Sequence, residues 1–430
     1  MGRNHRNKRK IQNKNIYSQS YLKILTLITL IVIFSLIGFI LFNTLKNNNK
    51  FQKSFQIATS EDISTQNSLE DTLNTQENSN LEKANSTFTL TAIGDVMCHN
   101  TQYWDAYNKE TDDYDFSYVF DEISLYTKKS DLTIGSLETS FAGKERGYSN
   151  YPTFNTPDDL AYNLKKIGVN VLSTAGNHCL DMGFTGLSRT IDILDKADIS
   201  HLGTYKTQEE RDTILIKYVK GVKIAFINYT YGTNGIPVPN DKPYCVNLID
   251  KELIQKDIES AKNQNADMII ACMHWGTEYR TTANEEQQQL ADFLFENGVD
   301  VILGNHPHVL EPMEKRTVTL SDGTTKYGFV IYALGNFICD QNAENTRNSI
   351  ILNLTITKHT DGKISIDKVD YIPIYMYKNT SAISRKMKLL DIEKTISAYE
   401  NGTDVSIGEK NYNYLKTQLE KIKSIVGEEI

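Results

Sequence analysis

The sequence predicts an α/β protein built from two packed sheets with helices on their faces. Three observations lead to this prediction. Helical patterns alternate with short apolar strands through the middle of the chain, later strands are joined by hairpin-type turns, and polar side chains follow the ends of the apolar strands. Near-continuous apolar strands are typical of sheets covered on both faces. With 430 residues, 40% of them hydrophobic, the chain can bury a sizeable core.

The N-terminal segment predicts a membrane anchor. Residues 1–50 hold nine Lys and Arg residues but neither Asp nor Glu, and residues 24–42 (ILTLITLIVIFSLIGFILF) carry no charge. As a helix, this uncharged run would span about 28 Å, close to the ~30 Å core of a bilayer. The positive-inside rule therefore predicts a basic cytoplasmic segment at 1–23, a single transmembrane helix at 24–45 and an extracellular remainder. A cleaved signal peptide is the alternative, disfavoured by the length of the run and by the lack of a small-x-small cleavage site.

The rest of the chain is acidic. Of 46 Lys and Arg residues, 37 remain beyond residue 50 against 54 Asp and Glu residues, a formal net charge of −17. This balance argues against nucleic acid as a partner, because clustered Lys and Arg bind phosphate backbones. An acidic polymer would also be repelled unless a local basic or metal-bearing patch meets it, although salt confines that repulsion to about 8 Å.

Composition divides the remaining sequence into three parts. Residues 46–87 are rich in Asn, Gln, Ser, Thr and Glu, and we expect a flexible linker because little apolar surface offsets the entropy of ordering. The composition becomes more apolar at FTLTAIGD, residues 88–95, where we expect the first strand of a domain over 88–378. In residues 379–430, apolar residues recur with helical spacing at 389–399 and 412–425, which predicts a helical C-terminal extension.

Within the domain, we expect three helix–strand units followed by more antiparallel elements. The expected helices are 158–167, 251–263 and 284–297, and the strands after them are 169–174, 267–273 and 299–303. The strands that look antiparallel are 222–228, 328–333, 349–357 and 364–371, with turns such as HTDGK between some of them.

Chemically active side chains follow five of the apolar strands. They are Asp95, Glu138, Asn177 with His178, His274, and His306 with His308. His306 and His308 by themselves could be two surface loop residues. Five strand ends carrying such side chains are hard to explain by packing, because burying them unpaired costs several kcal/mol. A metal centre gives all of them partners, and ligands in α/β folds gather beyond the carboxyl ends of strands.

These motifs, in this order, resemble those of the calcineurin-like metallophosphoesterases. The similarity is closer to the CapA or poly-γ-glutamate capsule synthesis family within that superfamily, and it covers roughly residues 88–345. The motifs are GDVM (94–97), SLETSFAG (136–143), YPTFNTP (151–157), STAGNHCLDMG (173–183), HWGTEY (274–279), NGVDVILGNHPHVLEP (297–312) and LGNFICDQ (334–341). The resemblance implies a calcineurin-like two-sheet sandwich.

The resemblance also implies a site for two divalent ions, of Mn, Fe or Zn. Glu138 would bridge the ions, Asp95 and His308 would complete one of them, and the other would be held by Asn177, His274 and His306. His178 would act as an acid or contact the transition state. Two such ions lower the pKa of a shared water and hold the oxygens of a reacting phosphorus centre.

Several positions leave alternatives open. Met97 stands where typical metallophosphoesterases have a ligand histidine, and a thioether is a poor ligand for such ions. Asp181 could orient His178 or cap a helix starting near Met182. We expect Glu278, Asn336 and Asp340 to line a substrate pocket.

We expect a membrane-anchored extracytoplasmic protein that acts in synthesis, export or attachment of poly-γ-glutamate or another surface polymer. It would work as a metal-dependent hydrolase, in contact with the membrane, with synthase subunits and with an anionic polymer or phosphate ester. The alternatives are a non-catalytic scaffold or polymer-binding subunit of a membrane synthase, and a generic surface metallophosphoesterase.

Overall fold

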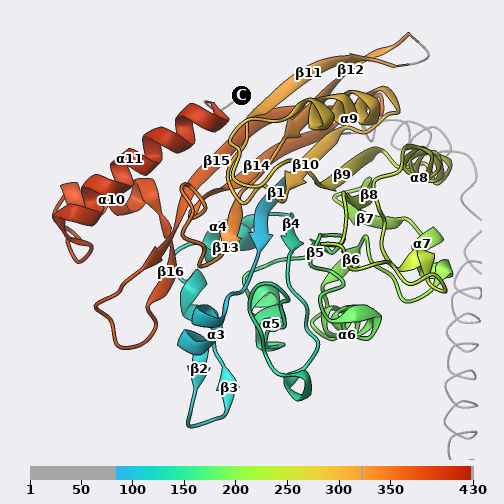
Figure 1. Cartoon of the computed structure of the whole chain (residues 1–430). Coiled ribbons are helices and arrows are strands. Elements are labelled where there is room, and N and C mark those ends of the chain that lie inside the picture. Colours follow the sequence, from blue (N-terminus) through green and yellow to red (C-terminus); the bar gives the residue numbers. More distant parts are fainter. Residues whose placement is uncertain (1–83, 321–322, 428–430) are drawn as a thin grey trace, which may run out of the picture. The chain divides into compact units, whose positions relative to one another are not determined.

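Two β-sheets form the centre of the chain, with helices on their outer faces (Figure 1). The computed structural model describes residues 84–320 and 323–427. The predicted basic segment, transmembrane helix and linker up to residue 83 lie outside the described residues. Among the described helices, none has the length and apolar character needed to cross a bilayer.

The larger sheet has eight strands and mixes parallel with antiparallel pairing. Its spatial order is β16 (Met387–Asp391), β15 (Ile364–Lys378), β14 (Asn348–Lys358), β1 (Ser86–Val96), β4 (Leu132–Leu137), β5 (Val171–Ser173) and β6 (Ser200–Leu202), with β13 (Asn336–Ile338) paired to β1. From β1 to β6 the neighbours are parallel, so their carboxyl ends meet at one edge.

The smaller sheet has six strands. Their order is β11 (Met313–Thr319), β12 (Thr325–Ile331), β10 (Val301–Asn305), β9 (Met268–His274), β8 (Val222–Thr230) and β7 (Leu215–Val219). The central strands β8, β9 and β10 are parallel. A short hairpin of β2 (Tyr107–Asn108) and β3 (Asp113–Tyr114) stands apart from both sheets.

Three hydrophobic clusters hold the layers together. The first lies between the sheets, where Leu90 and Leu352 of one sheet belong to the same cluster as Ile270 and Phe329 of the other. The second joins the outer face of the large sheet to α5 (Asp159–Lys166) and α6 (Gly183–Lys196). The third joins the small sheet to α8 (Lys251–Asn263) and α9 (Glu285–Glu296). Burial of this apolar surface is the main favourable contribution to folding, and it confirms the predicted two-sheet α/β arrangement.

The described residues also form three shorter α-helices. They are α3 (Asn100–Ala106), α4 (Ser124–Lys129) and α7 (Gln208–Asp212). The predicted helices at 158–167, 251–263 and 284–297 are confirmed within a residue or two as α5, α8 and α9. The strands expected after them are confirmed as β5, β9 and β10, also within a few residues.

Two expectations about strands were incomplete. The strands at 222–228 and 328–333 looked antiparallel, but β8 also pairs in parallel with β9, and β12 pairs in parallel with β10. Each is antiparallel only to its hairpin partner, β7 or β11. Hairpin turns reveal one neighbour of a strand, whereas the other neighbour is set by a crossover that the turn residues do not encode.

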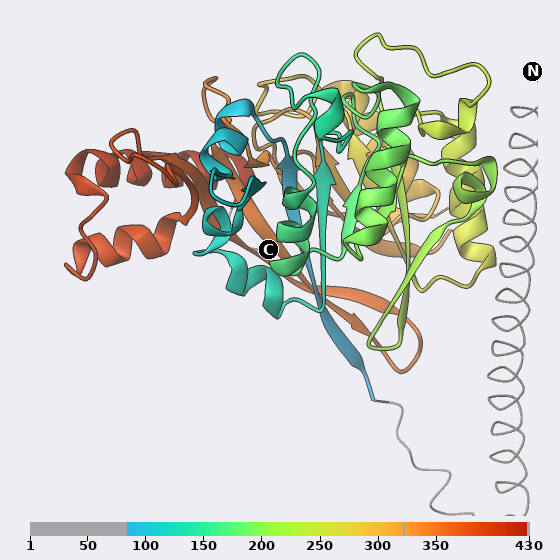
Figure 2. The ribbon, with the colours of Figure 1, turned by 90° about the horizontal axis from the view of Figure 1, so that it is seen from below.

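The C-terminal segment adds a strand and two helices to the large sheet. The helix expected at 389–399 was wrong at its start, because residues 387–391 form β16 and α10 (Ile392–Glu400) follows it. Helix α11 (Gly408–Val426) places Leu415 and Ile422 in the cluster between the sheets. Figure 2 shows these helices, in red, at one end of the unit formed by residues 84–430.

Candidate metal centre

The predicted ligands come together where the strands of both sheets end. Asp95 lies at the end of β1, Glu138 directly follows β4, and His274 ends β9. Gly94 allows this convergence, because a Cβ there would lie 1.9 Å from the carbonyl oxygen of Gly335. The glycine of the GD motif therefore lets β1 run against the segment that leads into β13.

Glu138 is the centre of the cluster. One carboxylate oxygen lies 3.8 Å from His274 Nε2, and the other lies 3.7 Å from His308 Nδ1. Ligand atoms of Glu138, His306 and His308 all lie within 4.8 Å of one another. Asn177 joins the group, since its amide oxygen is 2.9 Å from His274 Nε2. The structure thus brings together side chains from four separate strand ends.

The histidine pair reaches the cluster through an unusual backbone. His306 and His308 have φ angles of 99° and 61°, in the left-handed region that side chains other than glycine rarely adopt. The His306 amide donates a hydrogen bond of 3.1 Å to Asp95, which fixes the turn against the end of β1. The His306 and His274 rings then lie 4.9 Å apart, centre to centre. Strain of this kind gathers at functional sites, where the surrounding structure holds it in place.

The buried polar atoms of the cluster lack protein partners. Among the described residues, Asp95 Oδ1, both carboxylate oxygens of Glu138, and Nδ1 of His274 and of His306 make no hydrogen bond. Burial raises the pKa of Asp95 to about 7, and burial followed by the nearby Asp95 charge raises the pKa of Glu138 well above its usual value. Such groups are costly in a dry interior unless a cation compensates them.

Burial acts on the histidines in the opposite direction. It lowers the pKa of His306 to about 4 and of His308 to about 3, and it lowers the pKa of His274 well below its ordinary value. Neutral imidazoles with free nitrogens and ionisable carboxylates form the donor set that borderline divalent metals prefer. The residues present therefore suit a divalent metal site centred on Glu138, His306 and His308.

His178 lies beside the cluster and is held in place by Asp181. The His178 Nδ1 and Asp181 Oδ2 atoms are 2.8 Å apart, and the same oxygen accepts a 2.6 Å hydrogen bond from the Phe154 amide. Helix α6 begins at Gly183 with Met182 at its N-cap and without a side-chain cap. The capping interpretation of Asp181 is therefore wrong, and the carboxylate orients the imidazole instead.

Two further residues were not singled out from the sequence. Asn234, at φ 50°, accepts a hydrogen bond from the Asn177 amide at 3.2 Å and places its own amide nitrogen 3.3 Å from His178 Nε2. Tyr231 lies beside the site, with its ring tilted against that of His306 at 4.5 Å between centroids. Both belong to the segment YGTNG that follows β8, and its position after an apolar strand was the available signal.

The residues expected to line a substrate pocket lie in different surroundings. Glu278 is exposed, and its charge contributes to raising the pKa of Glu138. Asn336 is buried and its side-chain oxygen is 3.2 Å from His308 Nδ1, so it orients that ring. The Asp340 carboxylate is paired with Arg347 and Lys378, while its backbone amide donates to His99 Nδ1 at 3.1 Å.

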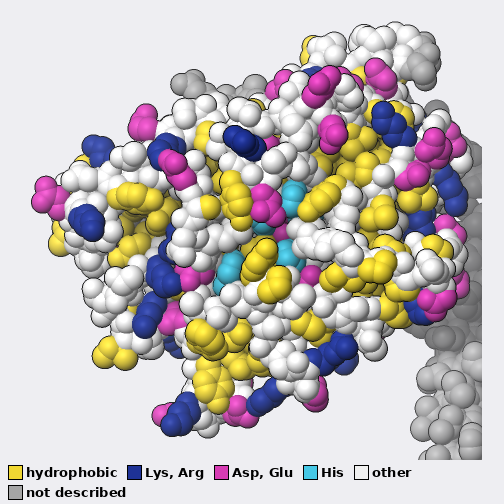
Figure 3. Space-filling view, viewed as in Figure 1, with side chains coloured by type: hydrophobic (Ala, Val, Ile, Leu, Met, Phe, Trp, Pro, Cys, Tyr) yellow, Lys and Arg dark blue, Asp and Glu magenta, His cyan; other side chains and the backbone are white. Residues whose placement is uncertain are grey.

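Two hydrophobic residues near the site are part of the core. Met97 is 2% exposed and lies among core side chains, and Trp275 is equally buried and donates its indole N–H to the Tyr332 carbonyl. On the molecular surface, the histidines are visible at the middle of the face drawn in Figure 3, between hydrophobic and acidic side chains. Only a small part of the cluster reaches this surface, since His274, His306 and His308 are each no more than 3% exposed.

Comparison with known proteins gives consistent matches. The profile of the family described as "Bacterial capsule synthesis protein PGA_cap" matches residues 89–341. "Capsule biosynthesis protein CapA" of Bacillus anthracis is 28% identical over 282 residues, which cover 63% of this chain and 64% of that protein. "PGA biosynthesis protein CapA" of Bacillus subtilis (strain 168) is 29% identical over 260 residues, covering 59% of this chain and 64% of that protein. The matched part thus spans less than two thirds of either relative.

Among solved structures, a calcineurin-like phosphoesterase of Bacillus subtilis covers 77% of this chain and 99% of its own. Its TM-score is 0.41 and its sequence identity is 15%.

Proposed function

This chain belongs to the bacterial capsule synthesis protein family, and from that membership we propose that it acts in making, exporting or attaching a surface polymer of the poly-γ-glutamate type. Two Bacillus relatives named for capsule or PGA biosynthesis support the polymer class. We propose further that the chain is held in the cell membrane by residues 24–45, with the N-terminus in the cytoplasm and the metal centre outside the cell.

The observation that carries a hydrolytic role is the set of buried, partnerless carboxylate and imidazole atoms around Glu138. Asp95, Glu138, Asn177, His274, His306 and His308 would hold divalent ions, which supply an activated water and charge stabilisation at the reacting centre. The number of ions, their identity and their division between the ligands belong to this proposal.

The chain's own residues then position the proton donor. Asp181 holds His178 Nδ1, which leaves Nε2 directed toward Asn234 and the cluster. Phe154 packs edge-on against the His178 ring at 4.8 Å and limits its movement. Because Nδ1–H donates to Asp181, Nε2 carries a proton only when the ring is protonated. That imidazolium would give its Nε2 proton to a leaving group, which is the role of a general acid.

The test uses the full chain purified in detergent, with its metal content measured by elemental analysis. We expect bound divalent metal, and Mn²⁺-dependent cleavage of a γ-linked glutamate oligomer or of a chromogenic phosphodiester. His178→Ala should abolish turnover and keep the metal. A chain that binds no metal under any condition would refute the site.

A second candidate function is a non-catalytic subunit of a membrane synthase, and Met97 is the observation that favours it. Its buried thioether stands where typical metallophosphoesterases have a ligand, so the site has one donor fewer. Metal binding with no turnover of either substrate, together with co-purification of synthase subunits, would support this alternative over hydrolysis.

A further inference from the structure

A pocket separate from the metal centre is lined by residues of the C-terminal part of the chain, between Arg347 and Thr417. Its volume is about 500 Å³, within the range of small-molecule sites. We call it the C-terminal pocket, and its main lining residues are Arg347, Tyr375, Tyr377, Lys378, Lys410 and Tyr414. These residues come from β15, α11 and the segment before β14. All of them lie beyond residue 341, outside the segment that the family profile matches.

The charged side chains that line the pocket are all cationic, and no Asp or Glu is among the lining residues. Arg347 and Lys378 share the carboxylate of Asp340. Lys410 is exposed and forms no ion pair with any described residue. Three cations against the single carboxylate of Asp340 leave a local charge of +2. This is the kind of basic patch that an acidic polymer needs to approach a chain with an overall negative charge.

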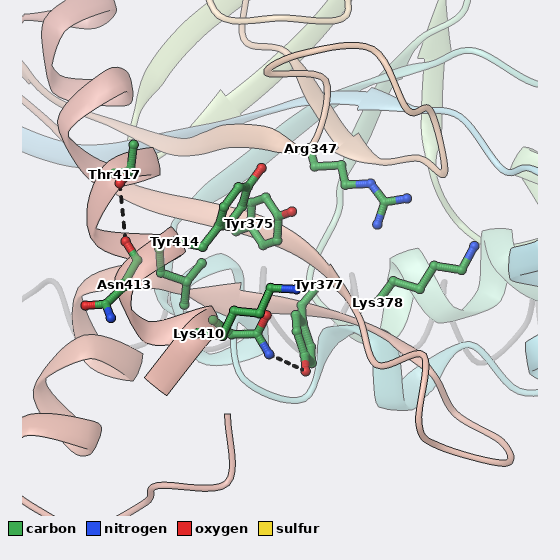
Figure 4. Close-up of a pocket in the computed structure, with 10 residues that line it drawn as sticks. Arg347, Tyr375, Tyr377, Lys378, Lys410, Asn413, Tyr414 and Thr417 are labelled. Atoms are coloured by element: carbon green, nitrogen blue, oxygen red, sulfur yellow. Dashed lines mark hydrogen bonds between the residues drawn. The ribbon is translucent and has the colours of Figure 1, made fainter. Parts of the chain in front are cut away.

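Aromatic rings and hydroxyl groups complete the pocket. Figure 4 shows the Arg347 and Lys378 head groups on one side and the rings of Tyr375 and Tyr414 on the other. The Tyr375 and Tyr414 rings meet at 5.7 Å, and Tyr414 is 48% exposed. Asn411 donates to the Tyr377 hydroxyl at 3.3 Å, which orients that group within the pocket. Rigid tyrosines present apolar surface for a polymer backbone and hydroxyl donors for its anionic groups.

The pocket is connected to the metal centre by a short chain of contacts. Arg347 Nε donates to the Gln341 carbonyl at 3.2 Å, and Gln341 accepts from Asn336 at 2.9 Å. Asn336 in turn lies 3.2 Å from His308. Gln341 is therefore the single residue between Arg347, which lines the pocket, and Asn336, which orients the predicted ligand His308. In Figure 3, Lys and Arg side chains accordingly lie between the histidines and the C-terminal helices.

We propose that the C-terminal pocket binds carboxylate groups of the polymer chain whose next residues reach the metal centre. The proposal rests on the proposed function for the choice of a carboxylate polymer. Arg347 and Lys410 supply the charge that binds the carboxylates, and the tyrosines contact the backbone between them. The pocket is thus a polymer-binding subsite, while the chemistry stays at the metal centre.

The test measures binding of a fluorescent γ-linked glutamate oligomer to the full chain in detergent by anisotropy. Lys410→Glu brings the local charge from +2 to zero at an exposed residue without a partner, so the fold is unaffected. We expect it to weaken binding about tenfold or more at low salt. The control is Lys196→Glu on α6, which makes the same charge change away from α11 and should leave binding within about twofold.

The outcomes separate this proposal from the proposed function. Weaker binding by Lys410→Glu supports the pocket even if no variant shows turnover, a result that would overturn only the hydrolytic role. Unchanged binding by Lys410→Glu overturns the pocket, even where His306→Ala abolishes turnover. Equal affinity for a polyphosphate of the same charge, equally reduced by Lys410→Glu, overturns the choice of a carboxylate polymer.

Discussion

Replacing Glu311 by Gln should stabilise the protein in alkaline solution. Glu311 is fully buried, three residues beyond His308, with one carboxylate oxygen bonded to Gln287 at 2.6 Å. Its other oxygen has no partner among the described residues. Burial raises its pKa from 4.5 to about 7, because the charged form loses its hydration.

The magnitude follows from linkage. The folded state holds this proton more tightly than the unfolded state, so the stabilising contribution is complete below pH 4.5 and is lost as the pH rises through 7. A shift of about 2.5 units corresponds to about 3 kcal/mol, at 1.36 kcal/mol per unit. Gln keeps the shape of the protonated acid and has no proton to lose. The variant and the wild type should therefore be equally stable near pH 4.5 and differ by about 3 kcal/mol at pH 8.

The assay is urea unfolding of residues 84–430 at a series of pH values, with each variant compared to the wild type at the same pH. Glu286→Gln on the exposed face of α9 is the control, and it should change the unfolding free energy by less than about 0.5 kcal/mol at every pH. A constant difference between Glu311→Gln and wild type from pH 4.5 to 8, or a loss of stability at pH 8, would refute the reasoning.

Three further predictions concern the site and its support. His306→Ala should lose bound metal by elemental analysis and lose the rise in melting temperature on adding Mn²⁺, whereas His201→Ala, whose ring pairs with Asp195 outside the site, should keep both. Asn234→Ala should lower kcat about tenfold with metal content unchanged, because Asn234 holds Asn177 and His178 in position, and Asn240→Ala on the same loop should have no effect. Arg211→Met should lower the free energy of unfolding in urea by about 3–5 kcal/mol, because it leaves the buried Asp257 carboxylate without its 2.7 Å partner. The control is Lys256→Met, whose exposed ion pair with Asp212 contributes under about 1 kcal/mol. A loss for Arg211→Met no greater than that of the control would contradict this prediction.

The sequence by itself predicted the candidate ligands and His178, but not Asn234 or Tyr231 beside them. Each predicted ligand follows an apolar strand, and strands of this kind end at a common edge when helices connect them in parallel. The order of motifs in residues 88–345 was enough to identify the family. The helices α5, α8 and α9 could be predicted because their apolar residues recur with helical spacing.

The tertiary structure alone decided how these residues relate in space. It placed β8 and β12 beside parallel neighbours, since pairing across a sheet depends on crossovers rather than on local turns. It assigned Asp181 to His178, because the carboxylate accepts from the Phe154 amide and the His178 ring while α6 begins without a side-chain cap. It also located the basic C-terminal pocket, which draws on residues 347–417. Long-range proximity of this kind arises from burial of a shared core, and no local pattern in the sequence encodes it.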